Sequence, residues 1–292
     1  MALLFRALLY LASLPGRDSA FRLTRGIAWL LSKSEAAEVT EINLQACFPE
    51  WQKEPLERVS RQSLRHMVML FFEMAQLRFW PTSRLLNNIE VFDQHVLDAA
   101  RAEGQGLILL VPHLGNWEIM STYLGHHYSL AALYDPPKVS GLETEIKAAR
   151  ERFAGKMFAI GVGGMRNILK ELKGGGLVAI LPDQVPERDA GVYAPFFDRP
   201  ALTMTLPLQL QRRTNAAMVL ACVTRKMDAD GRMLGYALNF RKVADTKTPE
   251  AFAKEVNLLI EREVRRSPAQ YQWDYKRFKR PPGRERNIYR RQ

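Results

Sequence analysis

The feature that most constrains the fold is a regular alternation of short apolar runs and longer amphipathic stretches, which begins after Gly104. Short apolar runs bounded by glycine and proline are typical of buried strands, and the longer stretches have the spacing of helices. We predict strands at 107–111, 129–134, 156–160 and 177–181, with helices at 117–126, 142–153 and 164–173 between them. This order is typical of βαβ units, so the chain is predicted to be an α/β protein with a largely parallel central sheet flanked by helices.

Two of these units resemble each other. "GQGLILLVPH" and "GGGLVAILPD" both run from a glycine-rich turn through an apolar strand to a proline and a polar residue. The final residues are His113 and Asp183. If both strands lie in one parallel sheet, His113 and Asp183 emerge at the same edge, and ligands of open α/β sheets bind at that edge.

The rest of the chain fits one domain. Helices are predicted at 54–80, 205–214 and 249–266, and strands at 216–226 and 233–242. No Ser/Gly-rich linker or low-complexity tract interrupts this order. We therefore predict a single α/β domain at 34–275, preceded by a separate N-terminal segment and followed by a basic C-terminal tail at 276–292.

The tail predicts an anionic partner. It carries much of the net charge of +11 and contains one acidic residue, Glu285. Nucleic acid, an acidic membrane surface and an acidic protein all suit such a segment. Phe278 and Tyr289 are too sparse to form a base-stacking platform, so a nucleic-acid partner is not expected.

The N-terminal segment, 1–33, is predicted to be helical and membrane-associating. Its two apolar stretches are shorter than the ~18 residues that indicate a spanning helix, and arginines are interleaved with Leu, Phe and Trp. That pattern is typical of a basic helix lying in a membrane interface. The alternative is a helix that simply packs on the domain.

The predicted helix at 54–80 is apolar nearly all round in its second half, so it is either deeply buried or lines an apolar groove. Glu73 and Arg78 stand out there as charges that need partners. They are candidates for an ion pair, for snorkelling side chains, or for substrate-binding residues if the helix lines a groove.

The stretch "VPHLGNWE" is the main candidate for chemistry. Asn116 can cap a helix beginning near Trp117, which places His113 in the loop after a strand and Glu118 in the first helical turn. Histidine titrates near neutral pH and can take a proton from an alcohol, and a carboxylate on its other ring nitrogen fixes its tautomer. The alternative is an ordinary loop histidine beside a glutamate favoured by the helix dipole.

Other site classes find little support. The sequence has no GxSxG, no GxxxxGK[ST] and no HExxH, and Arg166 in "GVGGMR" stands where a dinucleotide-binding fingerprint has a small residue. Cys47 and Cys222 have no metal-like spacing and suggest a reducing compartment. We therefore expect neither a metal nor a cofactor.

Several motifs carry a resemblance to a known family. The segment "HLGNWE" is similar to the HxxxxD/E signature of glycerolipid-type acyltransferases, and its Gly-Asn-Trp-Glu form resembles the lipid A late acyltransferases of Gram-negative bacteria. Four further segments fall in that family's order: "NLQACFPEW", "LPDQ", "APFFDRPALT" and "QYQWDYKRFKRPPG". The likeness spans nearly the whole chain.

The resemblance implies transfer of a fatty acyl group from acyl carrier protein to a hydroxyl of a lipid A precursor, at the cytoplasmic face of the inner membrane. It implies a dyad of His113 and Glu118, with Arg150 and Asp183 as further active-site positions. Arg150 has two open roles, stabilising an oxyanion or clamping a phosphate. Neighbours of these motif residues are the candidate substrate-binding residues Asn116, Trp117 and Gln184.

The sequence departs from the family pattern at two places. Asp198 stands where the family commonly has glycine, and Asp274-Tyr275 replaces a pair whose second residue is histidine in many members. Both departures weaken assignment to a subfamily. Three rivals remain: acyl transfer to another bacterial glycolipid or aminolipid, hydrolysis of acyl thioesters, and a non-catalytic basic membrane-binding protein.

Overall fold

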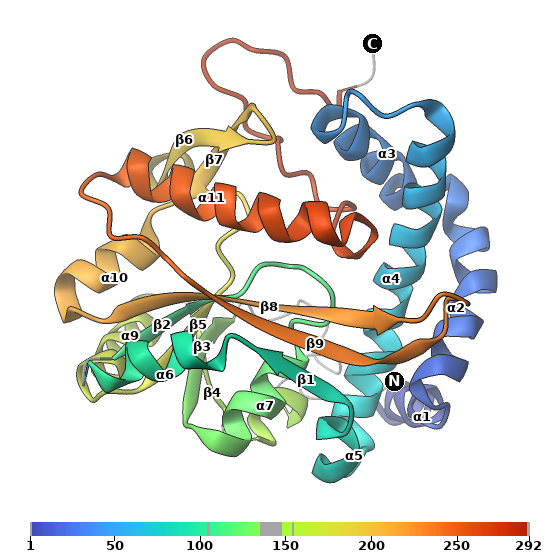
Figure 1. Cartoon of the computed structure of the whole chain (residues 1–292), viewed down its shortest axis with the longest axis horizontal. Helices are drawn as coiled ribbons and strands as arrows, with labels where there is room; N and C mark the ends of the chain where they lie inside the picture. The colour runs from blue at the N-terminus through green and yellow to red at the C-terminus, as the bar shows by residue number, and fades with distance from the viewer. Residues whose placement is uncertain (1, 104–105, 135–147, 154, 291–292) are drawn as a thin grey trace.

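The computed structural model describes the chain except for residues 1, 104–105, 135–147, 154 and 291–292 (Figure 1). The helices are α1 (Ala2–Ser13), α2 (Arg17–Leu30), α3 (Glu35–Cys47), α4 (Lys53–Phe79), α5 (Thr82–Leu86), α6 (Gln94–Ala102), α7 (Ile119–His127), α9 (Val162–Lys173), α10 (Leu206–Thr214) and α11 (Pro249–Arg266). The strands are β1 (Ile89–Phe92), β2 (Leu107–Leu110), β3 (Leu130–Tyr134), β4 (Gly155–Ala159), β5 (Leu177–Ile180), β6 (Gly191–Phe196), β7 (Arg199–Met204), β8 (Ala217–Met227) and β9 (Met233–Lys242).

The predicted parallel sheet is confirmed. Within the described residues it has seven strands in the order β1-β9-β8-β2-β5-β3-β4, and β8 with β9 is its antiparallel pair. Every predicted strand is present with ends within one residue or so. Half of the helix expected at 142–153, residues 142–147, lies outside the described residues, and residues 148–151 are helical.

Both faces of the sheet are covered, as expected for parallel strands that are apolar throughout. On β2, Ile108 and Leu110 join the core cluster that contains α10 and α11, whereas Leu107 and Leu109 join the cluster that contains α4, α6 and α7. Figure 1 shows α11 on one side of β8 and β9 and α6 with α7 on the other. The sheet is therefore the middle layer, and its strand ends are free to carry a site.

The hairpin β6–β7 was not predicted as strands. It pairs Phe196 with Arg199 across a two-residue turn, where Phe197 has φ 50° and Asp198 has φ 57°. Such turns need left-handed backbone, which glycine adopts freely and which aspartate tolerates. This explains how Asp198 can stand where the family commonly has glycine.

The N-terminal helices pack on α4 with one face and expose apolar side chains on another. Leu9 and Phe21 are buried, whereas Leu11, Trp29 and Leu30 are exposed. No helix in the described part of the chain is long and apolar enough to cross a membrane. Packing on the domain is thus observed, and membrane association stays a prediction.

The basic tail is folded onto the domain along part of its length. The side chain of Arg277 is buried and donates hydrogen bonds to the backbone oxygen of Leu202 and to Thr203 Oγ1. Phe278 is buried, and the hydroxyl of Tyr289 donates to Asn43 Oδ1. These residues stabilise the fold, so only the exposed part of the tail's charge is available to a partner.

Candidate active site

The two similar β-strand units bring His113 and Asp183 together. Strands β2 and β5 are parallel neighbours with Leu110 beside Ile180. A proline, Pro112 or Pro182, follows shortly after the end of each strand. His113 Nδ1 lies 2.8 Å from Asp183 Oδ1, and the His113 backbone N–H donates to Asp183 Oδ2 at 2.9 Å. Both side chains are buried. The prediction that they share one sheet edge is confirmed.

Asp183 is held in its charged form. Burial by itself raises the pKa of this carboxyl, but the charge of His113 and the two hydrogen bonds from His113 outweigh burial, so the pKa lies below its ordinary value. Tyr271 is also buried, and burial and then the Asp183 charge raise its pKa well above the usual range. Asp183 is therefore an anion beside a neutral phenol, suited to hold a proton on His113 Nδ1.

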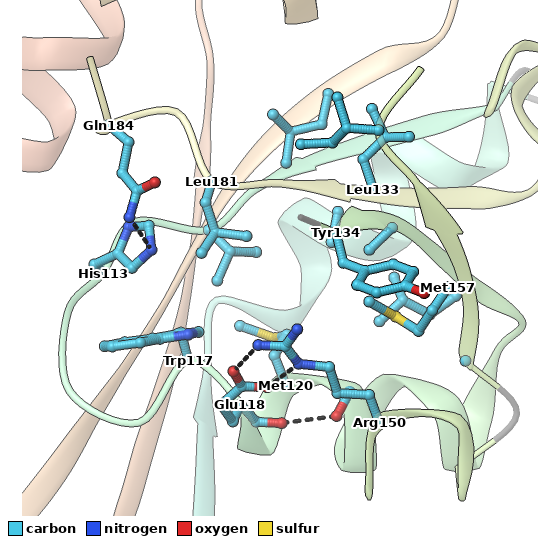
Figure 2. Close-up of a pocket in the computed structure, with 18 of the residues that line it drawn as sticks. His113, Trp117, Glu118, Met120, Leu133, Tyr134, Arg150, Met157, Leu181 and Gln184 are labelled. Carbon is cyan, nitrogen blue, oxygen red and sulfur yellow. Dashed lines mark hydrogen bonds and ion pairs between the residues drawn. The ribbon is translucent and has the colours of Figure 1, made fainter. Parts of the chain in front are cut away.

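The other ring nitrogen of His113 points into a pocket. Gln184 Nε2 lies 3.1 Å from His113 Nε2, so the amide donates to a ring nitrogen that carries a lone pair when Nδ1 is protonated. The ring of Trp117 meets the imidazole edge to face at 4.8 Å between centroids. Figure 2 shows Gln184 and Trp117 on either side of His113. With Nδ1 protonated, the Nε2 lone pair therefore lies at the wall of the pocket.

The expected contact between His113 and Glu118 is wrong. Glu118 forms a bidentate ion pair with Arg150 through Arg150 Nε, at 2.9 Å, and Arg150 Nη2. The Glu118 charge raises the pKa of Arg150. Figure 2 shows Trp117 between His113 and Glu118. The spacing correctly predicted a loop that begins at His113. The carboxylate that reaches His113, however, is Asp183, which follows the neighbouring parallel strand β5.

The chain reversal at Gly115 explains this separation. Gly115 has φ 63°, and a Cβ there would lie 1.9 Å from the backbone oxygen of Val223. Its N–H donates to the backbone oxygen of Gln270. Because residue 115 is glycine, the loop can lie directly against β8, where a side chain would not fit. This path places Glu118 on the far side of Trp117 from His113 (Figure 2).

The pocket itself is mostly apolar, with a cavity volume of about 460 Å³. Its polar lining consists of His113, Glu118, Ser121, Arg150 and Gln184, with the indole of Trp117 beside them. The remaining lining is largely aliphatic and aromatic and includes Leu130, Leu133, Tyr134, Met157, Ile160, Leu181, Met204 and Leu206. A lining of this kind suits an acyl chain whose reactive end lies at the histidine.

Two of the predicted substrate-binding residues lie elsewhere. Glu73 and Asn116 are buried and do not line the pocket. Glu73 instead accepts hydrogen bonds from Arg225 Nε at 2.8 Å, from Arg225 Nη2 at 2.5 Å and from the hydroxyl of Tyr236 at 3.0 Å. Asn116 Nδ2 donates to that same hydroxyl at 3.1 Å.

Arg78 and its helix are likewise absent from the described lining of the pocket. The guanidinium of Arg78 lies over the ring of Phe79, and Glu73 takes Arg225 rather than Arg78 as its ion-pair partner. Of the two alternatives for the apolar second half of this helix, burial is the one observed, and the stretch 67–80 does not line the described pocket. The stretch is apolar all round because it is buried against α1, α2 and the sheet.

Sequence reasoning missed Arg225, Tyr236 and Tyr271. Arg225 lies on β8 and Tyr236 on β9, inside runs that otherwise read as apolar strand. A charged residue in a buried strand was the available signal, because such a charge needs a partner. Among the described residues, no group of three or more His, Cys, Asp and Glu side chains is placed to hold a metal ion.

The structure thus places a histidine, oriented by a buried carboxylate, in the wall of an apolar pocket. The chain belongs to the bacterial lipid A biosynthesis acyltransferase family, whose sequence model matches residues 2–280. The chain is thus an acyltransferase of lipid A biosynthesis.

Curated relatives agree. The chain is 29% identical over 248 residues to the lipid A biosynthesis palmitoleoyltransferase of Escherichia coli (strain K12), covering 85% of this chain and 80% of that protein. It is 25% identical over 272 residues to the lauroyltransferase of the same strain, covering 90% and 86%. Among solved structures, the 1-acyl-sn-glycerophosphate acyltransferase PlsC of Thermotoga maritima matches at a TM-score of 0.41 and 13% identity, over 93% of this chain and 99% of that one.

Proposed function

We propose that the protein transfers a fatty acyl group from acyl carrier protein to a hydroxyl of a lipid A precursor, with His113 as the general base. The observation that carries this proposal is the orientation of His113, with Nδ1 on Asp183 and Nε2 facing the apolar pocket. General-base catalysis needs an unprotonated nitrogen within reach of the substrate hydroxyl. No enzyme nucleophile is required, because the acceptor supplies the alcohol.

The reaction proceeds in one transfer. His113 Nε2 takes the proton of the acceptor hydroxyl, which occupies the position that Gln184 Nε2 holds in this structure. The acceptor oxygen attacks the thioester carbonyl, the carbon–sulfur bond breaks, and the leaving thiolate receives the proton from the imidazolium. Asp183 stabilises that imidazolium. The products are an ester on the acceptor and the free thiol of the carrier.

The Glu118–Arg150 pair has a separate role in the same pocket. Its two hydrogen bonds use Arg150 Nε and Nη2 and fix the plane of the guanidinium. Arg150 Nη1 then serves a substrate oxygen, either the oxyanion of the tetrahedral intermediate or a phosphate of the acceptor. An Arg150→Lys variant separates the two, because loss at the oxyanion lowers kcat and loss at a phosphate raises KM.

The proposed location is the cytoplasmic face of the inner membrane. Exposed apolar side chains on α1 and α2 suit a membrane interface, and the net charge of +11 suits both an acidic carrier protein and anionic lipid.

Mass spectrometry tests the reaction. A tetra-acylated lipid A precursor is incubated with acyl carrier proteins that bear chains of different length. The wild-type protein is expected to add one acyl group, and a His113→Ala variant with an unchanged melting temperature is expected to add none. Consumption of thioester with an unchanged precursor would show that the acceptor is wrong or that water replaces it. Unreduced transfer by His113→Ala would remove the proposed base.

A further inference from the structure

A second hollow lies between α2 and α4, with a volume of about 920 Å³. It shares no lining residue with the acyl pocket. Its described lining contains no acidic side chain. Five arginines line it: Arg22, Arg25, Arg58, Arg61 and Arg65. We call this hollow the arginine groove. Its composition points to an anionic occupant.

Two of the arginines have partial compensation from their own helices. Arg22 pairs with Asp18 at 2.9 Å, and Arg61 approaches Glu57 at 3.6 Å. Both are exposed i,i+4 pairs, which bind weakly and exchange readily with another anion.

The other three arginines have no carboxylate partner among the described residues. Arg25 and Arg58 are exposed and make no ion pair with them. Arg65 lies over the ring of Phe21 and donates to the Phe21 backbone oxygen. Burial lowers the pKa of Arg65, and the charge of Arg25 lowers it further. The groove thus concentrates positive charge whose mutual repulsion a bound anion relieves.

The rim of the groove is apolar. Leu23 and Trp29 line it and are 54% and 74% exposed, and the adjacent Leu30 is 72% exposed. Tryptophan and leucine beside arginine are typical of helices at the membrane–water boundary, where the rings lie at headgroup depth. Leu8 and Leu11 on α1, and Leu14 just after it, are exposed as well. Binding of a soluble anion or a nucleic acid would not require exposed apolar side chains around the groove.

We propose that the arginine groove binds the phosphate of an anionic membrane-lipid headgroup and thereby sets how the enzyme sits on the bilayer. Guanidinium groups bind phosphate through paired hydrogen bonds, and the apolar rim meets the acyl region beside the headgroup. The site is independent of acyl transfer, so its test measures membrane binding and can fail while the catalytic proposal stands.

The first test compares two double variants of the full chain in flotation assays with phosphatidylcholine vesicles, with and without phosphatidylglycerol. Arg25→Gln/Arg58→Gln removes the two exposed charges of the groove that have no described carboxylate partner. Arg213→Gln/Arg262→Gln removes the same charge from exposed positions on α10 and α11. The groove variant is expected to lose about thirtyfold in affinity for the phosphatidylglycerol vesicles, and the control to change less than about threefold.

The second test adds a charge without removing a contact. Gly26 lines the groove, and a Cβ there meets nothing within 4 Å. Gly26→Glu therefore places a carboxylate among the arginines, and Gly26→Ala is its matched control, since both replace a helical glycine. The glutamate is expected to weaken binding to phosphatidylglycerol vesicles about tenfold relative to the alanine. Thermal melts check that all variants are folded.

Three results would overturn the proposal. Equal losses in the two double variants would mean a diffuse charge effect. Release from the vesicles by inorganic phosphate, but not by sulfate at equal ionic strength, would mean a site for free phosphate. Unchanged vesicle binding with a raised KM for the acyl carrier protein substrate would mean that the groove docks the carrier.

Discussion

Two clusters of this protein each pair a buried carboxylate with a basic side chain, but they differ in their access to the pocket. Asp183 holds His113 at the edge of the acyl pocket, and Glu73 holds Arg225 beneath the loop that follows His113. Both carboxylates are buried and accept hydrogen bonds from a basic side chain. The first cluster presents His113 Nε2 to the pocket, whereas the side chains of the second are 0–1% exposed.

The first cluster therefore has a group that can reach a substrate in the pocket, whereas the second supports the fold. The Glu73 cluster reaches the site through Tyr236 and Asn116, whose Oδ1 accepts the N–H of Ile119 at the start of α7. It fixes the loop between His113 and Glu118 without touching the pocket. Removing a group from the first cluster should lower turnover, and removing one from the second should lower stability.

The largest effect is expected at Asp183. Asp183→Asn keeps the size of the side chain but no longer favours a proton on His113 Nδ1, so kcat should fall by about 10²- to 10⁴-fold while the protein stays folded. Steady-state kinetics and a thermal melt measure both quantities. A loss of stability without a loss of kcat in the folded protein would place Asp183 with the supporting cluster.

The next effect is expected at Glu73. Glu73→Gln leaves the charge of Arg225 buried without a counter-charge, which should reduce the free energy of unfolding by about 3–5 kcal/mol. Denaturant unfolding measures it, and Glu73→Gln/Arg225→Met should recover part of the loss. Glu35→Gln, which breaks an exposed pair with Lys276, is the control and should change stability by less than about 1 kcal/mol. Equal effects at Glu73 and Glu35 would contradict the account.

A smaller effect is expected at Tyr236. Tyr236→Phe removes one hydroxyl that links Asn116 to Glu73, so stability should fall by about 1–3 kcal/mol because two buried partners lose a hydrogen bond. The change in kcat should be smaller than that of Asp183→Asn. A Tyr236→Phe enzyme that is stable but inactive would show that the hydroxyl takes part in the chemistry.

The smallest effect concerns acid. An unfolded aspartate titrates near ~3.9, and the pKa of Asp183 in the folded protein is lower, so its stabilisation is full above that pH and is lost as the pH falls through the folded value. The unfolding free energy of the wild type should fall more steeply below about pH 4 than that of Asp183→Asn. Parallel curves would mean that the pair adds no pH-dependent stability.

The sequence predicted the part of the site that lies in regular elements. The similarity between the units ending at His113 and Asp183 was enough to place both at one sheet edge, because parallel strands align their ends. It did not show that Glu118 turns away, since the direction of the loop depends on the close approach of Gly115 to Val223 on a distant strand.

The same limit applies to the partners of buried charges and to short strands. Glu73 pairs with Arg225, which lies 152 residues away in the chain, and no local pattern carries that information. Strands β6 and β7 escaped prediction because each contains a proline and lacks alternation, and because their turn uses Phe197 and Asp198 instead of glycine. Hydrophobic periodicity predicts helices and strands, whereas contacts between residues distant in the sequence determine the partners of buried charges and the path of the loops.

The central claim is that Asp183, and not Glu118, orients His113. The most direct measurement is the ¹⁵N NMR spectrum of the His113 ring, assigned by comparison with His113→Ala. The account predicts that the Nδ1-protonated tautomer dominates over the Nε2-protonated one in the wild type and in Glu118→Gln, and that the balance shifts toward the other tautomer in Asp183→Asn. An unchanged tautomer in Asp183→Asn together with a changed one in Glu118→Gln would contradict it.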